Sequence, residues 1–241
     1  MSDPLIEVRG LTFGYGEAGA ALKEVDFRLE QGENVALLGP NGSGKTTFVL
    51  HLIGLLEGAG SIEVCGMRMA KSNIAAIRRK IGVVFQDSES QLFMPTVLED
   101  VAFGPLNNGL DNHEALHRAL HALQTVGMEA AAERPPYHLS AGEKKRAAIA
   151  GILATKPDIL ALDEPTTFLD PPGQRSLAGL LSSLPQAKII VTHNIPFALS
   201  LCTRAVFFQE GRIVANGPVA EIVRRFGWEP AATTLGSESR A

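Results

Sequence analysis

Short apolar segments with two different patterns alternate along this chain. Some segments place apolar and polar residues in turn, as half-exposed antiparallel strands do; these are IEVRG at residues 6–10 and VDFRL at residues 25–29. Others are continuous apolar runs, which are typical of strands buried on both faces; these are VALL at 35–38, ILAL at 159–162 and IIV at 189–191. Two further strands are expected at residues 61–66 and 81–86. The patterns predict a mixed sheet with a parallel centre.

Helical patterns occupy the middle of the chain, at about residues 112–127 and 140–155, and a further helix is expected over residues 46–56. Buried-strand patterns then resume at Asp158 and Lys188. This order is typical of an α/β core with a helical insertion. A chain of 241 residues can bury one substantial core carrying a subdomain. We therefore expect one domain over residues 1–228, with a core of residues 1–86 and 156–228 around a helical subdomain of residues 87–155, and a disordered tail at 229–241.

Composition narrows the function classes without selecting one. Hydrophobic residues make up 45% and charged residues 20%, which is ordinary for a soluble globular protein. The net charge of −4 argues against a general nucleic-acid binder, because duplex affinity rests on basic surface. The opening residues contain no apolar signal core, and the longest apolar run, AAIAGILA, is far shorter than the about 18 residues of a spanning helix. Cys65 and Cys202 are far apart, which favours two structural thiols in a reducing cytosol.

The clearest chemical motif is GPNGSGKTT at residues 39–47, which matches the phosphate-loop pattern. It lies directly after a predicted buried strand and before a predicted helix, as the motif requires. Glycines let successive backbone amides point inward as an anion nest, and the helix N-terminus adds partial positive charge. Lys45 can then reach the β- and γ-phosphates of a nucleotide, while the Thr46 hydroxyl can hold Mg²⁺. The other residues of the predicted phosphate cradle are Gly39, Pro40, Asn41, Gly42, Ser43, Gly44 and Thr47.

A pair of carboxylates in DILALDEP supplies partners for this loop. Asp163 ends an apolar run, which places it at the C-terminal edge of a buried strand, where ligands collect in open α/β sheets. Its expected role is Mg²⁺ coordination, direct or through water. Glu164 is next in sequence and points elsewhere, so we expect it to act as the general base for an attacking water.

Three further motifs make the comparison specific: LSAGEKKRAAIAGILA from Leu139, DILALDEPTTFLD from Asp158 and VTHN from Val191. Together with the phosphate loop, and in this order, they resemble the ATP-binding cassette family over nearly the whole chain. The resemblance implies a P-loop NTPase (RecA-like) core with an antiparallel β-subdomain and an inserted helical subdomain. It also implies that two subunits sandwich two ATP molecules, each bound by one subunit's phosphate loop and the other's signature motif.

The resemblance assigns roles to several residues. Ser140, Gly142 and Glu143 form the signature at the start of a helix, where a γ-phosphate can be bound. His193 would contact that phosphate and hold Glu164 and the water, while Gln86 would sense Mg²⁺ and the water. Tyr15 in FGYG would stack on adenine. Asp170 ends the loop after the magnesium-binding strand.

The signature departs from the common family form, reading Ser-Ala-Gly-Glu in place of Ser-Gly-Gly-Gln. Ala141 adds a methyl group near phosphate and Glu143 adds negative charge, but the hydroxyl and the key glycine remain. With Glu164 and His193 both present, both sites of a homodimer are expected to hydrolyse ATP.

The stretch FQDSESQLFMPTVLEDVAFGP at residues 85–105 fits neither helical nor strand periodicity as core. It resembles the corresponding segment of the energy-coupling-factor and cobalt or nickel importer ATPases, where a short helix after the glutamine loop forms part of a groove for a transmembrane partner. The segment that begins at Asp87 and ends at Pro105 is therefore the expected docking surface. Acids at Asp87 and Glu89 beside apolar Leu92, Phe93 and Val97 suit a partly basic amphipathic helix.

The cargo is not specified by the motifs. His113, His117 and His121 recur every fourth residue, and histidines at this spacing can bind a divalent metal. However, Ala115, Leu116, Ala119, Leu120 and Leu123 already supply the buried stripe of that helix, which leaves the histidines on its solvated side.

The function that best accounts for these motifs is the ATPase subunit of an importer at the cytoplasmic face of a membrane, dimeric with itself or with a paralogous cassette. Cobalt or nickel is the expected cargo, and an energy-coupling-factor vitamin importer is the alternative. A substrate-binding membrane subunit would be an indirect partner. A DNA-repair or chromosome-organising ATPase would usually carry a long coiled-coil or zinc-bearing insertion, whereas only about 90 residues separate the phosphate loop from the signature. Intact Glu164 and His193 weigh against a non-hydrolysing regulatory cassette.

Overall fold

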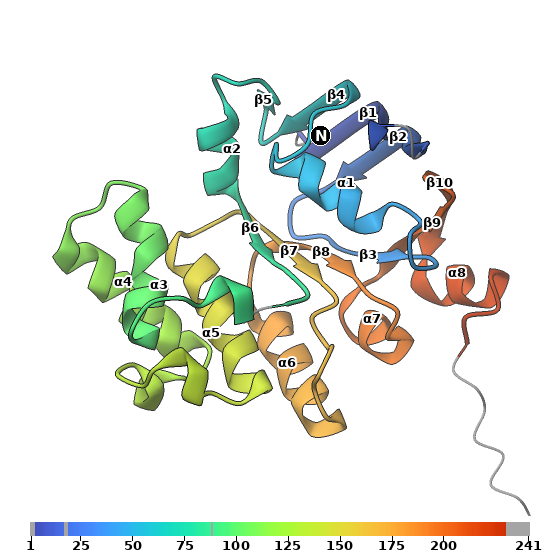
Figure 1. Ribbon diagram of the computed structural model, residues 1–241. Coiled ribbons are helices and arrows are strands. Elements are labelled where there is room, and N and C mark those ends of the chain that lie inside the picture. The colour runs from blue at the N-terminus through green and yellow to red at the C-terminus, as the bar shows by residue number, and fades with distance from the viewer. Residues whose placement is uncertain (1–2, 17–18, 88, 230–241) are drawn as a thin grey trace, which may run out of the picture.

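The computed structural model describes residues 3–16, 19–87 and 89–229, and it builds them around a six-stranded sheet (Figure 1). The strand order is β10-β9-β3-β8-β7-β6. All neighbours are parallel except β10, which pairs antiparallel with β9 at one edge. Every residue of β7 and β8 is buried, as continuous apolar strands between two layers require. The strands are β3 Asn34–Leu38, β6 Ile81–Val84, β7 Ile159–Asp163, β8 Ala187–Val191, β9 Arg204–Gln209 and β10 Arg212–Pro218.

The alternating segments form a separate antiparallel sheet, with the order β2-β1-β4-β5. Its buried face meets α1, which lies between the two sheets (Figure 1). Phe48 of α1 packs between Phe27 of β2 and Phe208 of β9, with ring centroids 5.2 and 5.5 Å away. One apolar cluster thus joins both sheets. The elements are β1 Ile6–Gly14, β2 Ala20–Leu29, β4 Ala59–Val64, β5 Met67–Arg68 and α1 Lys45–Leu52.

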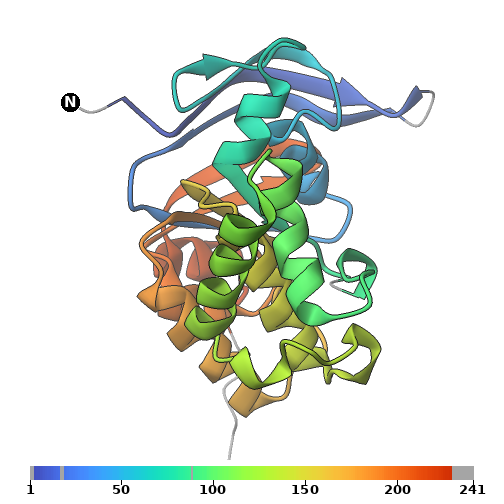
Figure 2. The ribbon, with the colours of Figure 1, turned by 90° about the vertical axis from the view of Figure 1, so that its left-hand side faces the viewer.

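Helices cover the other face of the six-stranded sheet and enclose a second apolar cluster. Figure 2 shows the four-stranded sheet as one layer at the top of the view, with most of the helices below it. These helices are α3 Val97–Asn107, α4 Asn112–Thr125, α5 Ala141–Ala154, α6 Pro171–Ser183, α7 Ile195–Leu201 and α8 Val219–Arg225, with short 3-10 turns at Glu89–Gln91, Glu129–Ala131 and Pro136–His138. Helix α2, Ile74–Lys80, instead packs its buried Ile77 into the first apolar cluster.

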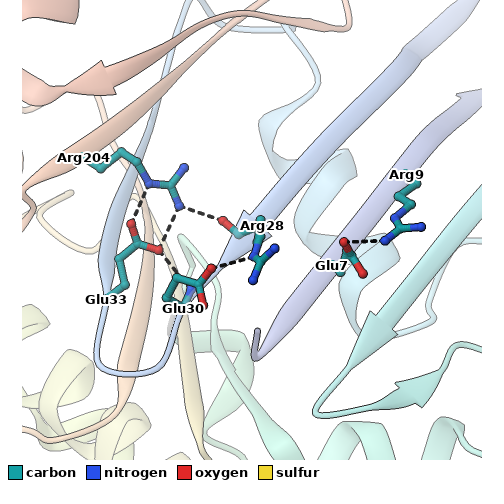
Figure 3. A network of polar contacts seen from close by, with 6 residues as sticks. All are labelled: Glu7, Arg9, Arg28, Glu30, Glu33 and Arg204. Carbon is teal, nitrogen blue, oxygen red and sulfur yellow. Dashed lines mark hydrogen bonds and ion pairs between the residues drawn. The ribbon is translucent and has the colours of Figure 1, made fainter. Parts of the chain in front are cut away.

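A polar network also ties the two sheets together (Figure 3). The Arg204 guanidinium on β9 donates to both carboxylate oxygens of Glu33, at 2.6 and 2.9 Å, and to the backbone carbonyl of Arg28 on β2 at 2.7 Å. Burial opposes ionisation of Glu33, but the hydrogen bonds from Arg204 and Glu30 outweigh it and lower the pKa of this carboxyl. Bidentate arginine–carboxylate pairs fix orientation as well as charge, so this pair holds the turn before β3 against β9.

The predicted division into alternating and fully buried strands is confirmed. The single mixed sheet expected from it is wrong for the alternating strands, which form an antiparallel sheet of their own. The helix expected at residues 46–56 is shorter than predicted, because α1 ends at Leu52 and Gly54 takes a φ of 62°. Residues 230–241 of the predicted tail lie outside the described residues. In the described ranges, no helix combines the length and apolar character needed to cross a membrane.

Residues 85–105, whose pattern fits neither helical nor strand periodicity, contribute core residues in their second half. α3 begins at Val97, and Thr96 and Glu99 form a capping box at its N-terminus. Val97 and Val101 are completely buried in the helical cluster. Val97 therefore does not belong to the exposed docking surface, whereas Phe93 is 62% exposed.

Candidate functional site

The predicted phosphate loop connects β3 to α1 and wraps around the Lys45 ammonium. Lys45 Nζ donates to the carbonyl oxygens of Gly39 and Pro40, at 2.7 and 2.8 Å. Burial lowers the pKa of Lys45, and the nearby carboxylates of Glu164 and Asp163 act against this effect. Loop amides, a lysine and a helix N-terminus therefore converge at one point, which is the arrangement that binds phosphate groups.

Two of the three residues expected at the magnesium ion, Thr46 and Asp163, lie side by side although they are far apart in sequence. The Thr46 hydroxyl at the start of α1 donates to Asp163 Oδ2 at the end of β7, at 2.7 Å. Asp163 is 4% exposed, and burial raises the pKa of its carboxyl against the lowering effect of the Thr46 hydrogen bond. A hydroxyl and a carboxylate are hard oxygen ligands, so these residues could hold Mg²⁺ together with phosphate oxygens.

Glu164 turns away from Asp163 and meets His193. The backbone of Glu164 has a φ of 45°, and its N–H donates to the Val191 carbonyl of β8 at 2.8 Å. Its carboxylate Oε2 lies 2.9 Å from His193 Nδ1. The side chain of Glu164 is 11% exposed and that of His193 is 69% exposed. The histidine thus covers a nearly buried carboxylate and faces solvent itself.

Tyr15 follows β1 and lies beside the start of α1. Its hydroxyl oxygen is 3.4 Å from Thr47 Oγ1, and its ring meets Phe13 edge to face with centroids 4.8 Å apart. Tyr15 remains 48% exposed beside the phosphate loop. This position is compatible with the stacking role expected for Tyr15.

Gln86 lies just beyond β6, and α5 holds its backbone rather than its side chain. Lys145 Nζ of α5 donates to the Gln86 carbonyl oxygen at 3.0 Å. Lys145 is 2% exposed, and burial lowers the pKa of its ammonium while Asp87 and Asp163 oppose that shift. Gln86 and Lys145 line a cavity of about 580 Å³ with Ala141 and Phe168. The glutamine loop and the signature helix are therefore joined through a buried lysine.

The signature residues lie apart from the phosphate loop of the same chain. Ser140 and Glu143 cap α5, with Glu143 N–H donating to Ser140 Oγ at 3.3 Å. A Cβ atom at Gly142 would lie 3.7 Å from Leu169 Cδ2, so this glycine packs against the loop after β7. Among the described residues, no hydrogen bond or ion pair joins Ser140, Gly142 or Glu143 to residues 39–47.

Comparisons with known proteins agree with this arrangement of motifs. A sequence model of the family described as "ABC transporter" matches residues 22–167. The energy-coupling factor transporter ATP-binding protein EcfA of Methanosphaera stadtmanae is 45% identical over 224 residues, covering 90% of this chain and 81% of the relative. This chain belongs to the ABC transporter family as an ATP-binding subunit.

Solved ABC cassettes share its fold. The structure of cbiO1 from Clostridium perfringens, described as part of the ABC transporter complex cbiONQ, has a TM-score of 0.85 and 35% identity, covering 93% of this chain and 92% of that one. The ATP-binding cassette MJ0796, a dimer in a post-hydrolysis state bound to ADP and Pi, has a TM-score of 0.78 and 30% identity, covering 89% of this chain and 98% of that one. The P-loop fold class predicted from the sequence is confirmed.

Asp170 has a structural role in this cassette that sequence reasoning did not include. Its carboxylate accepts from the backbone N–H of Gly173 at 2.8 Å and so caps α6. Asn194, which follows His193, donates to Gln174 Oε1 at 2.8 Å, and Gln174 in turn donates to the Leu169 carbonyl at 3.0 Å. The loops that carry His193 and Asp170 are therefore connected through α6.

Lys145 and Arg134 were also missed as site residues. Lys145 is one of three consecutive basic residues, and nothing in the sequence distinguishes it from the other two as a buried cation; likewise nothing near Arg134 indicates its partner. Arg134 forms an ion pair with Glu143 of the signature at 2.9 Å. Both contacts cross between segments, so spacing in the sequence does not predict them.

The histidine face of α4 is exposed at all three positions, His113, His117 and His121, as expected. The predicted buried stripe is wrong at Leu116 and Leu120, which are 40% and 47% exposed, while Ala115, Ala119, Ala122 and Leu123 form the contact with the core. Across the described ranges, no group of three or more His, Cys, Asp or Glu side chains could hold a metal ion.

Proposed function

We propose that this chain is the ATP-hydrolysing subunit of a membrane importer and works at the cytoplasmic face of the membrane. One observation carries the hydrolytic part: the fold brings Thr46 to Asp163 at 2.7 Å and His193 to Glu164 at 2.9 Å, around the phosphate loop. Each pair joins residues from separate segments, and each supports one step, metal binding or water activation.

The residues present suit ATP and Mg²⁺. Gly39 and Gly44 lie where a Cβ atom would clash with neighbouring backbone, so only glycine allows this loop conformation. The Lys45 side chain already lies within the loop. Thr46 and Asp163 supply the hard oxygen atoms that Mg²⁺ prefers. When bound, magnesium would neutralise charge on the phosphate oxygens.

Glu164 has the surroundings of a general base. It directly follows a buried strand, and its side chain is nearly buried. The His193 imidazole contacts one of its carboxylate oxygens. A fixed carboxylate can accept a proton from a water in line with a phosphate without first losing a solvent shell. Tyr15 would stack on adenine, and Gln86 would respond to the metal and the water.

A second cassette completes the site in this proposal. Ser140 and Gly142 are presented at the N-terminus of α5, away from their own phosphate loop, so they are available to the nucleotide of a partner subunit. That partner is a second copy of this chain or a paralogue. The dimeric form of the related cassette MJ0796 supports this assembly.

The start of α3 offers the docking surface for a transmembrane coupling subunit. Phe93 and Phe103 are 62% and 40% exposed and stack edge to face with centroids 5.0 Å apart. Both line a groove of about 240 Å³ together with Asp100. Asp100 Oδ1 accepts from the N–H groups of Phe93 and Met94, at 2.9 and 3.0 Å, while the buried Oδ2 has no hydrogen-bond partner among the described residues. An apolar groove with an acidic residue in its lining suits an amphipathic helix that carries a basic side chain.

Cobalt or nickel ions are the proposed cargo, and a vitamin taken up through an energy-coupling-factor importer is the alternative. The likeness to cbiO1 supports the first and the likeness to EcfA supports both. Copurification of the membrane partners, followed by uptake of radiolabelled cobalt, nickel or vitamins into proteoliposomes, distinguishes these cargoes. ATP-dependent uptake of a vitamin without metal uptake would exclude the metal proposal.

The hydrolytic proposal is tested with Glu164→Gln. Because the glutamine cannot take a proton, we expect ATP binding to persist while turnover falls by about 10²-fold or more. Glu221→Gln, at an exposed position on α8, is the matched control. ATPase activity of Glu164→Gln equal to that of the control would refute the assignment of Glu164.

A further inference from the structure

Glu143 places a negative charge directly on the signature serine. Its Oε2 accepts from both the backbone N–H and the hydroxyl of Ser140, each at 2.8 Å. The Ser140 N–H lowers the pKa of Glu143 most, the Ser140 hydroxyl adds to this, and Arg134 contributes further, so the carboxyl is ionised at neutral pH. The hydroxyl proposed to meet a γ-phosphate is therefore bound to an anion, and an anion there repels phosphate unless it is balanced.

Arg134 supplies the balancing charge. Its Nη1 donates to Glu143 Oε1 at 2.9 Å, while Nη2 donates to the carbonyl oxygen of His138 at 2.8 Å. One oxygen of Glu143 thus faces the serine and the other faces the arginine. The guanidinium also holds the chain just before the signature, because His138 is two residues from Ser140.

The position of Arg134 is fixed from the other side by α3. The Arg134 carbonyl accepts from the N–H of Val97 at 3.0 Å, and the Ala132 carbonyl accepts from the N–H of Leu98 at 2.9 Å. These donors are the first two residues of α3, whose N-terminal N–H groups have no partners within the helix. The backbone of Arg134 is thereby bound to the proposed docking helix and its side chain to the signature.

We propose that Arg134 is a positioning residue for the ATP-driven dimer: it neutralises Glu143 and fixes that side chain on Ser140, so that the signature meets the partner's nucleotide without net negative charge. This inference rests on the proposed function, because the phosphate contact of Ser140 belongs to it. The ion pair with Arg134 also explains how Glu143 can replace the glutamine of the common family form. A glutamine is neutral and needs no counter-ion.

A double-mutant cycle with Arg134→Ala and Glu143→Gln tests the proposal in the full chain. Dimer formation is followed by light scattering against ATP concentration, with Glu164→Gln present in every variant to prevent turnover. We expect Arg134→Ala to raise the half-maximal ATP concentration about tenfold when Glu143 is present. In the Glu143→Gln background, the increase in half-maximal ATP concentration caused by Arg134→Ala should be at least fivefold smaller, because no carboxylate is then left without its counter-ion.

Ionic strength gives a second readout. Between about 0.1 M and about 1 M salt the Debye length falls from about 10 Å to about 3 Å. The defect of Arg134→Ala should shrink over this range relative to the same chain with Arg134 intact, since it arises from repulsion between charges. Arg118→Ala is the matched control: Arg118 pairs with Glu114 at 2.8 Å on α4, and we expect its loss to shift the ATP dependence less than twofold.

Two results would overturn the inference while leaving the proposed function intact. One is an Arg134→Ala chain that dimerises with ATP as readily as the chain with Arg134. The other is a salt-independent defect of equal size with Glu143 intact and with Glu143→Gln, which would indicate a packing role alone. If Arg134→Ala is unfolded by circular dichroism, Arg134→Lys and Arg134→Gln replace it, and only the lysine variant should retain the ATP response. Failure of the unsubstituted chain to hydrolyse ATP or to dimerise with it would sink the proposed function and this inference together.

Discussion

Two glycines of the phosphate loop allow steric exclusion to be separated from backbone strain. Gly39 and Gly42 both have positive φ, 136° and 75°. A Cβ atom at Gly39 would overlap the carbonyl oxygen of Phe208 on β9 and lie 3.0 Å from its carbonyl carbon, whereas one at Gly42 would meet no atom of the described residues within 4 Å. Alanine at the two positions should therefore have different consequences.

The magnitudes follow from these surroundings. Positive φ costs a non-glycine residue about 1–2 kcal/mol, and the stiffer unfolded chain offsets about 0.4–1 kcal/mol of that. We expect Gly42→Ala to lower the free energy of unfolding by about 1 kcal/mol. Gly39→Ala adds a clash with the backbone of a sheet strand, which can relax only by moving β3 away from β9, so we expect about 3 kcal/mol or more.

Urea unfolding of the nucleotide-free protein, followed by circular dichroism, measures both values. The slopes should agree with that of the unsubstituted chain, so that the midpoints report stability. Equal destabilisation by the two substitutions, or a larger effect at Gly42, would refute the steric account of the loop.

Two further predictions concern ionisable groups. Burial raises the pKa of Asp163, so the folded state binds its proton more tightly than the unfolded chain, and the carboxyl's contribution to stability is present at low pH and lost as pH rises through the folded pKa. Asp163→Asn should therefore raise the urea midpoint at neutral pH without Mg²⁺, by a margin that narrows toward the unfolded pKa of about 3.9; a less stable variant at neutral pH would contradict this. Burial raises the pKa of Cys202 to about 12, so its labelling by a thiol reagent at pH 8 should wait for unfolding, whereas the half-buried Cys65 reacts sooner. Equally fast labelling of both cysteines in the native protein, read by mass spectrometry, would show that Cys202 is accessible.

The parts of the site that sequence could predict are those with a fixed local geometry. The phosphate loop needs its glycines and lysine in order, and Asp163 ends an apolar run, so the meeting of Thr46 and Asp163 follows from strand order in an α/β sheet. The capping box of Thr96 and Glu99 was also readable as T-x-x-E, and it would have revealed α3.

The remaining contacts depend on how segments pack. Arg134 reaches Glu143 only because the chain before the signature is bound to the start of α3, and Lys145 reaches Gln86 only because α5 lies beside β6. Likewise Leu116 and Leu120 are exposed because the small side chains of Ala115 and Ala119 let α4 approach the core along a narrower stripe. No periodicity in a single segment encodes such pairings.

The joining of the two sheets has a consequence for ligand length. Tyr15 follows β1 of the antiparallel sheet, and the phosphate loop with Lys45 follows β3 of the six-stranded sheet. Arg204, Glu33 and the packed ring of Phe48 connect the two sheets. The fold therefore fixes the distance between Tyr15 and the phosphate loop before any ligand binds. In the proposed nucleotide site, a ligand whose ring and terminal phosphate match this spacing would contact both Tyr15 and the phosphate loop, and a shorter or longer ligand would contact only one of them. In that proposed site, discrimination by ligand length would come from scaffold residues that the nucleotide does not contact.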